Sequence, residues 1–317
     1  MGLIYTLLFI FITHMKKWLV LIPIIILLFV AGTYILIPST LDISKVELVK
    51  CNVNAASRII NEDSNWNKWW SPGGESGYCY KISRKLYQQV EVPFISSRLI
   101  AVSTLNFLSL NGKDSVVFRW DCSFKASLNP IKRIQQYREA LSISRAMNAV
   151  ISNLRIFLED KKNVYGINMR EIMGKDTALM ASKMVTGFYP GTNDVYKLIK
   201  DIRNYIKSQG AVETGYPMLN IKKTGDYQFE CMVAIPINRG LKGNSKFFPK
   251  HFVPLKILVA DVKGGSYSVN GAMNQMQLYI ADYQRTVMAI PFQSLITERD
   301  QVSDTSDWQT RIVQPIF

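Results

Sequence analysis

The sequence predicts an α+β protein in which an apolar N-terminal helix precedes two folded domains. Three observations predict this fold class: a long uncharged run near the N-terminus, strand-like segments closed by one long amphipathic helix, and a strand–helix–strand–strand series that occurs twice. A chain of 317 residues also exceeds one average core. We therefore expect a doubtful leader at 1–14, a transmembrane anchor at 15–40, one domain at 41–161 and a second at 162–317.

The apolar run extends from Trp18 to Pro38 without a charged residue, which is long enough for a helix to cross a bilayer. It is longer than the core of a signal peptide, and no Ala-x-Ala cleavage site follows it. Met15 precedes two lysines and resembles a natural start, so the natural start is either Met1 or Met15. The two lysines predict a single-pass protein of the inner membrane, with both domains on the extracytoplasmic side.

The segment 41–161 predicts an antiparallel sheet that one helix closes. Residues 45–55 alternate as in a half-buried strand, and three tryptophans follow among Asn, Pro and Gly at 57–74. Further strands are expected at 78–94, 96–110 and 115–124. Pro130 suits the first turn of a helix, and apolar residues at helical spacing continue towards residue 160. This order of elements is a helix-grip plan.

These residues resemble the polyketide-cyclase/START-like superfamily, also called SRPBCC. The matching stretches are NWNKWW after the first strand and FRWDCSFKASLNPIKRIQQYREALSISRAMNAVISNLRIFLE at the end of the domain. The resemblance implies a curved sheet wrapped on a helix around an apolar cavity for lipids, hormones or polyketides. It makes Trp66 and Trp70 candidate ligand contacts. The alternative is that both side chains seal the core, as buried tryptophans often do.

From about residue 164, a strand–helix–strand–strand unit occurs twice. The first unit is expected at 177–188, 195–210, 215–223 and 227–237, and the second at 255–265, 270–285, 289–297 and 308–316. Tyr205 corresponds to Tyr279, and Pro217 to Pro291, at one offset (279 − 205 = 291 − 217 = 74). Two such units that bury their faces together leave a groove along their pseudo-dyad, where ligand pockets commonly form.

This second domain resembles the GyrI-like (gyrase-inhibitor-like), or AraC-type, effector-binding domain of bacterial multidrug-responsive regulators. The matching stretches include GFYPGTNDVYKLIKDIRNYIKSQGAVETGYPMLNI and VADVKGGSYSVNGAMNQMQLYIADY. The resemblance implies a groove lined by aromatic residues, which makes Tyr189, Tyr216, Tyr267 and Trp308 candidate ligand contacts. In regulators this domain follows a DNA-binding domain. Here an anchor and a START-like domain take that place, which argues against a transcription factor.

One strand departs from the family pattern. After the second helix the family commonly has Pro-aromatic-Glu-x-Tyr, with the glutamate facing the pocket. This chain has PFQSL at 291–295, so Gln293 takes the place of the acid and Leu295 that of the tyrosine. An amide donates and accepts hydrogen bonds but carries no charge. Gln293 and Leu295 are therefore candidate ligand contacts, while cation binding and acid-dependent hydrolysis are disfavoured.

Composition and residue spacing disfavour several classes of function. The net charge of +14 comes from basic residues scattered among apolar ones, which favours a solvated basic surface, or contact with an anionic membrane, over nucleic acid. Because the chain has two histidines, a zinc site with two histidine ligands and a catalytic set based on histidine are both disfavoured. The acids between Glu298 and Asp307 lack the spacing of a calcium loop and suit a solvated turn. Cys231 shares strand parity with apolar neighbours, which predicts a buried thiol.

These observations predict a membrane-anchored, non-catalytic protein that binds or senses an apolar or amphipathic small molecule. We expect no catalytic residues, no metal, no cofactor and no nucleic acid partner. The alternatives are a cyclase- or hydrolase-like enzyme acting on a hydrophobic substrate, or a ligand-free scaffold whose cavities its own side chains fill. Ligand identity, disulfide status and oligomeric state stay open.

Overall fold

The computed structural model describes residues 21–71, 82–86, 88–95, 100–110 and 114–317. The chain divides into two compact units, with the boundary in the sequence between Glu159 and Asp160. Residues 21–36 are helical. No helix within the described ranges is both long and apolar enough to cross a membrane. The expected leader and the first part of the expected anchor, 15–20, lie outside the described residues.

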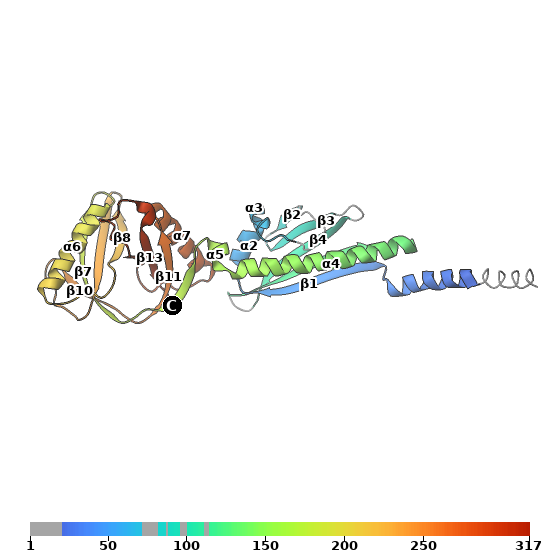
Figure 1. Cartoon of the computed structure of the whole chain (residues 1–317), viewed down its shortest axis with the longest axis horizontal. Helices are drawn as coiled ribbons and strands as arrows, with labels where there is room; N and C mark the ends of the chain where they lie inside the picture. The colour runs from blue at the N-terminus through green and yellow to red at the C-terminus, as the bar shows by residue number, and fades with distance from the viewer. Residues whose placement is uncertain (1–20, 72–81, 87, 96–99, 111–113) are drawn as a thin grey trace, which may run out of the picture. The chain divides into compact units, whose positions relative to one another are not determined.

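The first unit contains a five-stranded antiparallel sheet and one long helix (Figure 1). Its strands are β1 (Thr40–Val49), β2 (Arg84–Leu86), β3 (Gln89–Ile95), β4 (Ile100–Ser109) and β5 (Val116–Lys125), paired in the order β1-β5-β4-β3-β2. The helices α2 (Val53–Asn61) and α3 (Asp63–Trp66) follow β1, and α4 (Pro130–Glu159) follows β5. The single strand expected at 78–94 is instead two, because β2 turns back to pair with β3.

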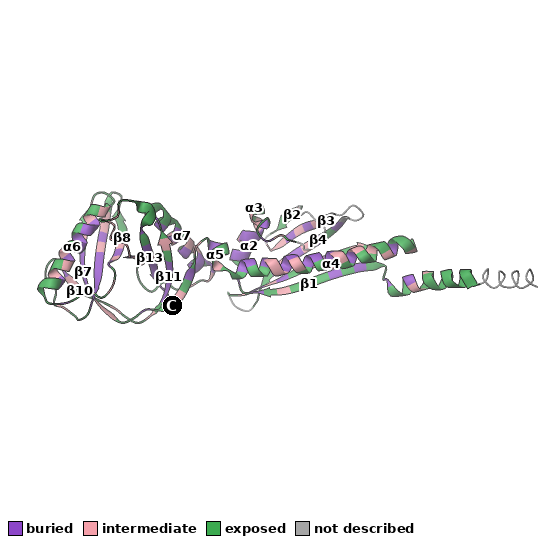
Figure 2. Cartoon of the chain, viewed as in Figure 1, coloured by how far each residue is buried: buried purple, intermediate pink, exposed green. Residues whose placement is uncertain are grey.

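Alternating side chains give this sheet one buried face. Phe118 and Trp120 of β5 are buried, whereas Arg119 between them is exposed. Helix α4 packs against β1, and its buried residues recur at helical spacing from Ala140 to Leu158. Figure 2 shows this buried stripe along α4. Removal of the stripe and the sheet face from water is the main stabilisation of the unit.

An aromatic cluster joins the α3 segment to the sheet. Its members are Trp66, Trp69, Trp70, Phe94 and Trp120. The ring centroids of Trp66 and Trp69 are 4.5 Å apart, and those of Phe94 and Trp120 are 5.5 Å apart. Trp66 is fully buried, and its indole N–H donates a hydrogen bond of 2.7 Å to a carbonyl of α2. The cluster therefore forms part of the core of this unit.

The second unit contains an eight-stranded antiparallel sheet in the order β10-β7-β9-β8-β12-β13-β11-β6. Its strands are β6 (Met169–Met173), β7 (Thr177–Thr186), β8 (Met218–Gly225), β9 (Gln228–Ile237), β10 (Phe248–Phe252), β11 (Lys256–Lys263), β12 (Phe292–Leu295) and β13 (Gln309–Pro315). Its helices are α5 (Lys161–Tyr165), α6 (Thr192–Ser208) and α7 (Ser266–Asp282), with a short 3-10 helix, η1, at Thr305–Asp307.

The strand–helix–strand–strand series occurs twice, as the sequence predicts. The first repeat is β7-α6-β8-β9 and the second is β11-α7-β12-β13; the helices begin at Thr192 and Ser266, at the same offset (266 − 192 = 74). The central strands β8 and β12 pair, and Leu219 lies opposite Gln293. These two residues are themselves equivalent (293 − 219 = 74), so the pseudo-dyad passes between them. Strands β6 and β10, which no pattern in the sequence predicts, form the two edges.

Both long helices cover the same face of this sheet. Leu295 of β12 packs in one core cluster with residues of α6, and Gln314 of β13 accepts a hydrogen bond of 3.2 Å from Gln277 of α7. Leu295 pairs with Thr310, so Leu295 and Gln314 share a face. Cys231 is fully buried in the α6 cluster, and burial raises the pKa of its thiol to about 12. The prediction of a buried thiol is confirmed.

The two long helices also end alike. In each, the two residues after the C-cap donate backbone N–H bonds of 3.0–3.1 Å to the last helical turn, which is a Schellman motif. The motif places Gly210 at φ +65° and its equivalent, Gln284, at φ +49°. Glycine adopts this left-handed conformation readily, but a residue with a Cβ atom is strained there.

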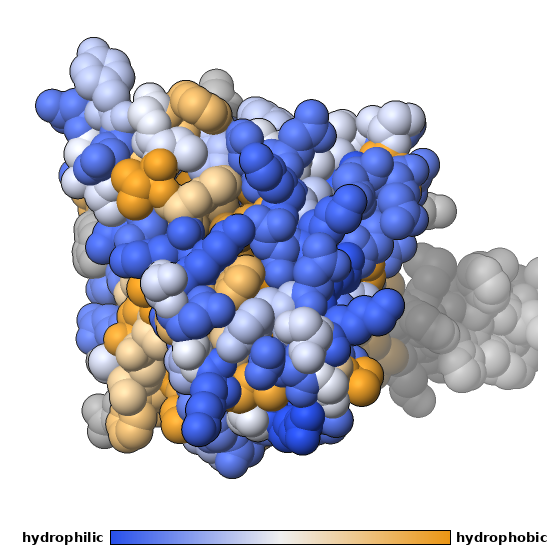
Figure 3. Space-filling view, turned by 90° about the vertical axis from the view of Figure 1, so that its left-hand side faces the viewer, coloured by the Kyte–Doolittle hydropathy of each residue, from blue (hydrophilic) through white to orange (hydrophobic). Residues whose placement is uncertain are grey.

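The outer surface of α6 is polar. Lys197, Lys200 and Lys207 are exposed, while the apolar residues between them are buried. Figure 3 shows this end of the second unit, where hydrophilic surface predominates and apolar side chains are scattered through it. The pattern agrees with the solvated basic surface expected from the sequence.

Candidate functional site

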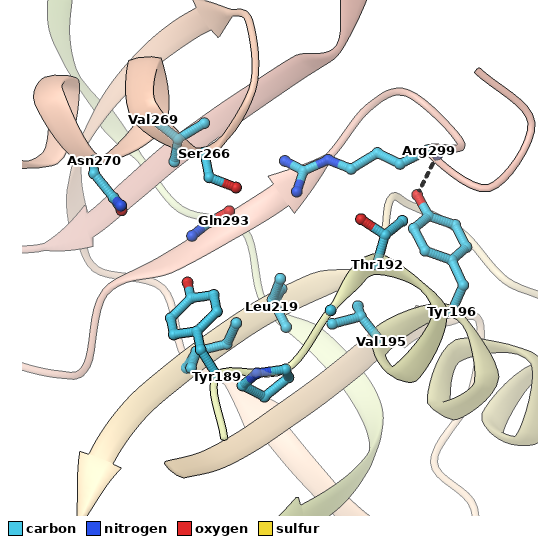
Figure 4. Close-up of a pocket in the computed structure, with 13 residues that line it drawn as sticks. Tyr189, Thr192, Val195, Tyr196, Leu219, Ser266, Val269, Asn270, Gln293 and Arg299 are labelled. Atoms are coloured by element: carbon cyan, nitrogen blue, oxygen red, sulfur yellow. Dashed lines mark hydrogen bonds between the residues drawn. The ribbon is translucent and has the colours of Figure 1, made fainter. Parts of the chain in front are cut away.

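A cavity of about 210 Å³ lies on the helix-bearing face of the second unit, where the two repeats meet (Figure 4). The first repeat contributes the start of α6 and part of β8. The second contributes the start of α7, β12 and the loop after β12. The lining residues are Tyr189, Pro190, Gly191, Thr192, Val195, Tyr196, Leu219, Ile221, Ser266, Val269, Asn270, Gln293 and Arg299.

The lining is built largely from equivalent positions of the two repeats. At the offset of 74, the equivalent pairs are Thr192 with Ser266, Val195 with Val269, Tyr196 with Asn270, and Leu219 with Gln293. The first two pairs keep the type of side chain, a hydroxyl and a valine. The last two differ, so the side of the cavity in the second repeat is more polar. Duplication thus explains the position of the cavity, and the differences set its chemistry.

Arg299 is the lining residue that carries a formal charge at neutral pH. Its Nη2 donates a hydrogen bond of 2.6 Å to Oγ1 of Thr310, and its Cζ lies 4.8 Å from the ring centroid of Trp308. Its Nε is buried and has no hydrogen-bond partner among the described residues. Burial holds the pKa of Arg299 below its ordinary value, because desolvation disfavours the charged guanidinium.

Tyr196 fixes the loop that carries Arg299. Its hydroxyl accepts a hydrogen bond of 2.7 Å from the backbone N–H of Arg299 and donates one of 3.0 Å to the carbonyl of Thr297. Glu298 in the same loop pairs with Arg203 of α6 at 2.6 Å. Burial raises the pKa of Tyr196, so its hydroxyl stays protonated at neutral pH. Helix α6 therefore positions the loop of the other repeat beside the cavity.

Tyr189 and Gln293 are predicted site residues that the structure brings together in this cavity. Gln293 lies on β12 beside the pseudo-dyad. The ring of Tyr189 packs edge-on against Phe229 with centroids 5.6 Å apart, and Figure 4 shows its hydroxyl directed towards Gln293. Burial is the largest cause that raises the pKa of Tyr189. A neutral phenol and an amide can donate hydrogen bonds to a ligand or accept them from one.

The other predicted site residues of this unit lie outside the cavity. Leu295 lies on β12 two residues after Gln293 and therefore further from the pseudo-dyad, where it is buried in the α6 core cluster. Tyr216 is exposed in the turn before β8. Tyr267 and Trp308 line a more open hollow at the start of α7, which adjoins the cavity and shares Thr192 and Ser266 with it. Tyr267 is 93% exposed, and the indole N–H of Trp308 donates a hydrogen bond of 2.8 Å to the carbonyl of Val302.

In the first unit, Trp66 and Trp70 belong to the aromatic cluster described above. Trp66 is inaccessible, whereas Trp70 is half-buried and contacts Phe94 and Trp120 at centroid distances of 5.9 Å. The structure places both side chains in the core, as the alternative interpretation of these tryptophans expects. Their assignment as ligand contacts stays a prediction.

Sequence reasoning missed Arg299, Ser266 and Asn270 as lining residues. Thr192 and Tyr196, the equivalents of Ser266 and Asn270 at the start of α6, were missed as well, although the duplication predicts that the starts of both helices lie near the pseudo-dyad. Arg299 offered no such signal, since the loop after β12 is longer than its counterpart between β8 and β9. Its place depends on the tertiary bonds to Tyr196 and Thr310.

The acidic segment after β12 holds its carboxylates apart. Glu298 pairs with Arg203, Asp307 pairs with Lys263 at 3.0 Å, and Asp304 accepts a hydrogen bond from the backbone N–H of Ser306. Each of these three acids therefore has a structural role. Within the described part of the chain, no group of three or more His, Cys, Asp or Glu is placed to share a metal ion.

No family model matches this sequence, and none of the curated proteins matches it. Among solved structures, the EcmrR C-terminal domain is similar at 15% identity and a TM-score of 0.42, over 48% of this chain and 98% of that one. EcmrR in its DNA complex is similar at 15% identity and 0.43, over 60% and 72%. SAV2435 bound to tetraphenylphosphonium is similar at 17% and 0.31, over 48% and 94%. Likeness at this level transfers no ligand, partner or reaction to this chain.

Proposed function

We propose that this chain is a membrane-anchored, non-catalytic protein that binds or senses a small molecule in the cavity of its second unit. The observation that carries the proposal is the cavity itself, at the meeting point of two repeats. Ligand sites in proteins are commonly concave, mostly apolar, and furnished with a few convergent polar groups. Here Val195, Leu219 and Val269 supply apolar surface, while Tyr189 and Gln293 supply hydrogen-bonding groups.

Binding would be driven by burial of apolar ligand surface, and polar contacts would set its orientation. The apolar residues come from α6, β8 and α7, and the polar ones come from both repeats, so a ligand would contact both repeats at once. A molecule bound in this way stabilises the folded unit by mass action. Its occupancy can then be detected as resistance to unfolding.

The anchor and its topology belong to the proposal. They are supported by the uncharged run from Trp18 to Pro38 and by the lysine pair before it. Fractionation of cells tests the anchor: we expect the full chain in the inner membrane, resistant to extraction by high salt and released by detergent. Protease added outside spheroplasts should digest both units. Recovery of the chain in the unextracted aqueous fraction would contradict anchoring, and protection from protease would contradict the topology.

One observation favours a structural role for the first unit. The cluster of Trp66, Trp69, Trp70, Phe94 and Trp120 occupies core space between α3 and the sheet with its own side chains. We therefore assign ligand binding to the second unit. An enzymatic role has less support, because none of the thirteen lining residues is Asp, Glu, His, Cys or Lys, so the hydroxyls of Thr192 and Ser266 have no carboxylate, imidazole or amine in the lining to act as their base.

Native mass spectrometry of the full chain, released from detergent micelles, tests the proposed function. We expect a retained adduct of defined stoichiometry. The variant Ser266→Trp places an indole in the cavity and should abolish the adduct. Tyr267→Trp is the matched control, because the neighbouring residue of the same helix is almost fully exposed and lies outside the cavity lining. An adduct that survives Ser266→Trp, or a bare mass after incubation with membrane and cytosolic extracts, would overturn the proposal.

A further inference from the structure

We infer that the ligand of this cavity is a small organic acid, whose carboxylate pairs with Arg299 while its apolar body lies against the valine and leucine side chains. This inference rests on the proposed function and specifies its chemical class. It follows from three properties of the described residues: the charge of the cavity lining, the unused hydrogen-bonding capacity of Arg299, and the different starts of α6 and α7.

The lining has one cation and no acid. Tyr189 and Tyr196 are neutral at physiological pH, and the remaining lining residues other than Arg299 do not titrate. The nearby acids are engaged elsewhere. Glu298 is paired with Arg203 at 2.6 Å, and Asp194 accepts a hydrogen bond of 3.0 Å from the backbone N–H of Gly191. Asp300 follows Arg299 and is exposed. Arg299 is therefore the charged group of the lining that a bound ligand would contact.

Arg299 has no ion-pair partner among the described residues, although it is largely removed from solvent. Acids close to a guanidinium raise its pKa, and the groups that raise the pKa of Arg299 are two tyrosines rather than a carboxylate. Desolvation of a charge is costly unless the charge is paired. An arginine left in this state beside a cavity indicates that its partner is a ligand. A cationic ligand would be repelled.

The orientation of the guanidinium suits a carboxylate. Thr310 accepts from Nη2 and the Trp308 ring lies beside Cζ, so the planar group is held in place from two sides. Figure 4 shows it extending towards Ser266 and Gln293 across the cavity. The Nε–H is buried and out of reach of a ligand, whereas Nη1 donates no hydrogen bond to the described residues and Nη2 uses one N–H on Thr310. A planar fork with unused N–H groups matches the two oxygens of a carboxylate.

The starts of the two helices differ in a way that adds to the attraction for an anion. In α6, Asp194 in the first turn neutralises part of the positive end of the helix dipole. The equivalent residue in α7 is Ser268 (268 − 194 = 74), and the first turn of α7 has no acid. Ser266, the first residue of α7, lines the cavity. The uncompensated helix end therefore favours the same sign of ligand charge as Arg299.

The test compares three probes of one shape: para-fluorobenzoate, para-fluorobenzamide and para-fluorobenzylammonium. Fluorine NMR of the full chain in detergent measures the affinity of each. We expect the benzoate to bind about tenfold or more tightly than the amide, and the ammonium not to bind. Arg299→Gln should weaken the benzoate by about tenfold or more and bring it level with the amide. Arg299→Lys keeps the charge and should retain a preference for the acid.

Arg170→Gln is the matched control, because Arg170 lies on β6 outside the cavity and its partner Asp261 keeps a second arginine, Arg311. It should leave all three affinities unchanged. Preferential binding of the amide or the ammonium would overturn the inference and leave the proposed function standing. Equal loss of benzoate binding in Arg170→Gln, or no binding of any probe at millimolar concentration, would also overturn it. Hydrogen exchange of the second unit confirms that each variant is folded.

Discussion

Replacing Gln284 with glycine should stabilise the second unit by about 0.5–1 kcal/mol. Gln284 has φ +49° at the position after the C-cap of α7, where the equivalent residue after α6 is Gly210. A left-handed conformation costs an ordinary L-residue about 1–2 kcal/mol. Glycine loses roughly 0.5–1 kcal/mol more conformational entropy on folding. The difference favours glycine. The side chain of Gln284 is exposed, so its removal sacrifices little burial.

The reciprocal change, Gly210→Gln, isolates the backbone contribution. A Cβ atom at Gly210 would lie 3.4 Å from the guanidinium of Arg239, which is an ordinary contact. Any loss of stability would therefore come from the left-handed backbone. We expect a destabilisation of about 0.5–1 kcal/mol, equal in size and opposite in sign to the gain at Gln284.

Hydrogen exchange measured by mass spectrometry across a urea series is the appropriate assay, because it reports the unfolding of each unit through its own peptides. Peptides of the second unit should shift in opposite directions for the two variants, and peptides of the first unit should not shift. Destabilisation by Gln284→Gly would refute the argument from backbone strain. Stabilisation by Gly210→Gln would refute it equally, because it would show that the side chain rather than φ controls this position.

Three further outcomes follow from the second unit. Tyr196→Phe removes the hydroxyl that accepts from the backbone N–H of Arg299, which should cost about 1 kcal/mol and speed amide exchange in that loop; unchanged exchange would contradict the role of this bond. Cys231, with a pKa of about 12, should resist alkylation at pH 8 until urea unfolds the unit, as peptide mapping would show; rapid native labelling would contradict its burial. Burial raises the pKa of Tyr279 from 10.0 to about 12, so the stability it contributes should be complete below pH 10 and lost as pH rises towards 12. Tyr279→Phe should lessen this alkaline loss in a urea titration, and an identical loss would show that another group is responsible.

The spacing of apolar residues predicted the long helices and strands well, because burial of one stripe of a helix or one face of a strand leaves a regular pattern in the sequence. The paired Tyr–Ile positions gave the offset of the duplication, and α6 and α7 start at that offset. The edge strands β6 and β10 left no such pattern, because most of their residues are exposed and strand preferences are less distinct at the edge of a sheet. The turn between β2 and β3 was missed for a related reason. Residues 84–86 are all exposed and carry no alternation.

The site was predicted in part. The resemblance pointed to Gln293, which takes the place of the family's glutamate, and to Tyr189 as one of the aromatic groove residues, and both line the cavity. Leu295 shares the parity of Gln293 but lies further from the pseudo-dyad, under α6. The alternation of side chains along a strand predicts the sheet face on which a residue lies, but not how far that residue is from the pseudo-dyad. Arg299 could not be predicted from the sequence, because its position depends on a loop that the hydroxyl of Tyr196 holds.

The pairing of Leu219 with Gln293 also bears on the origin of this domain. In a homodimer of single repeats, the residue beside the two-fold axis would meet its own copy, so every change there would be made twice. Joining both repeats in one chain removes that restriction. One repeat could keep an aliphatic side chain at the axis while the other acquired an amide, and a single arginine could enter from one side only. Gene fusion would thus have turned a symmetric crevice into one that can distinguish the two ends of a molecule.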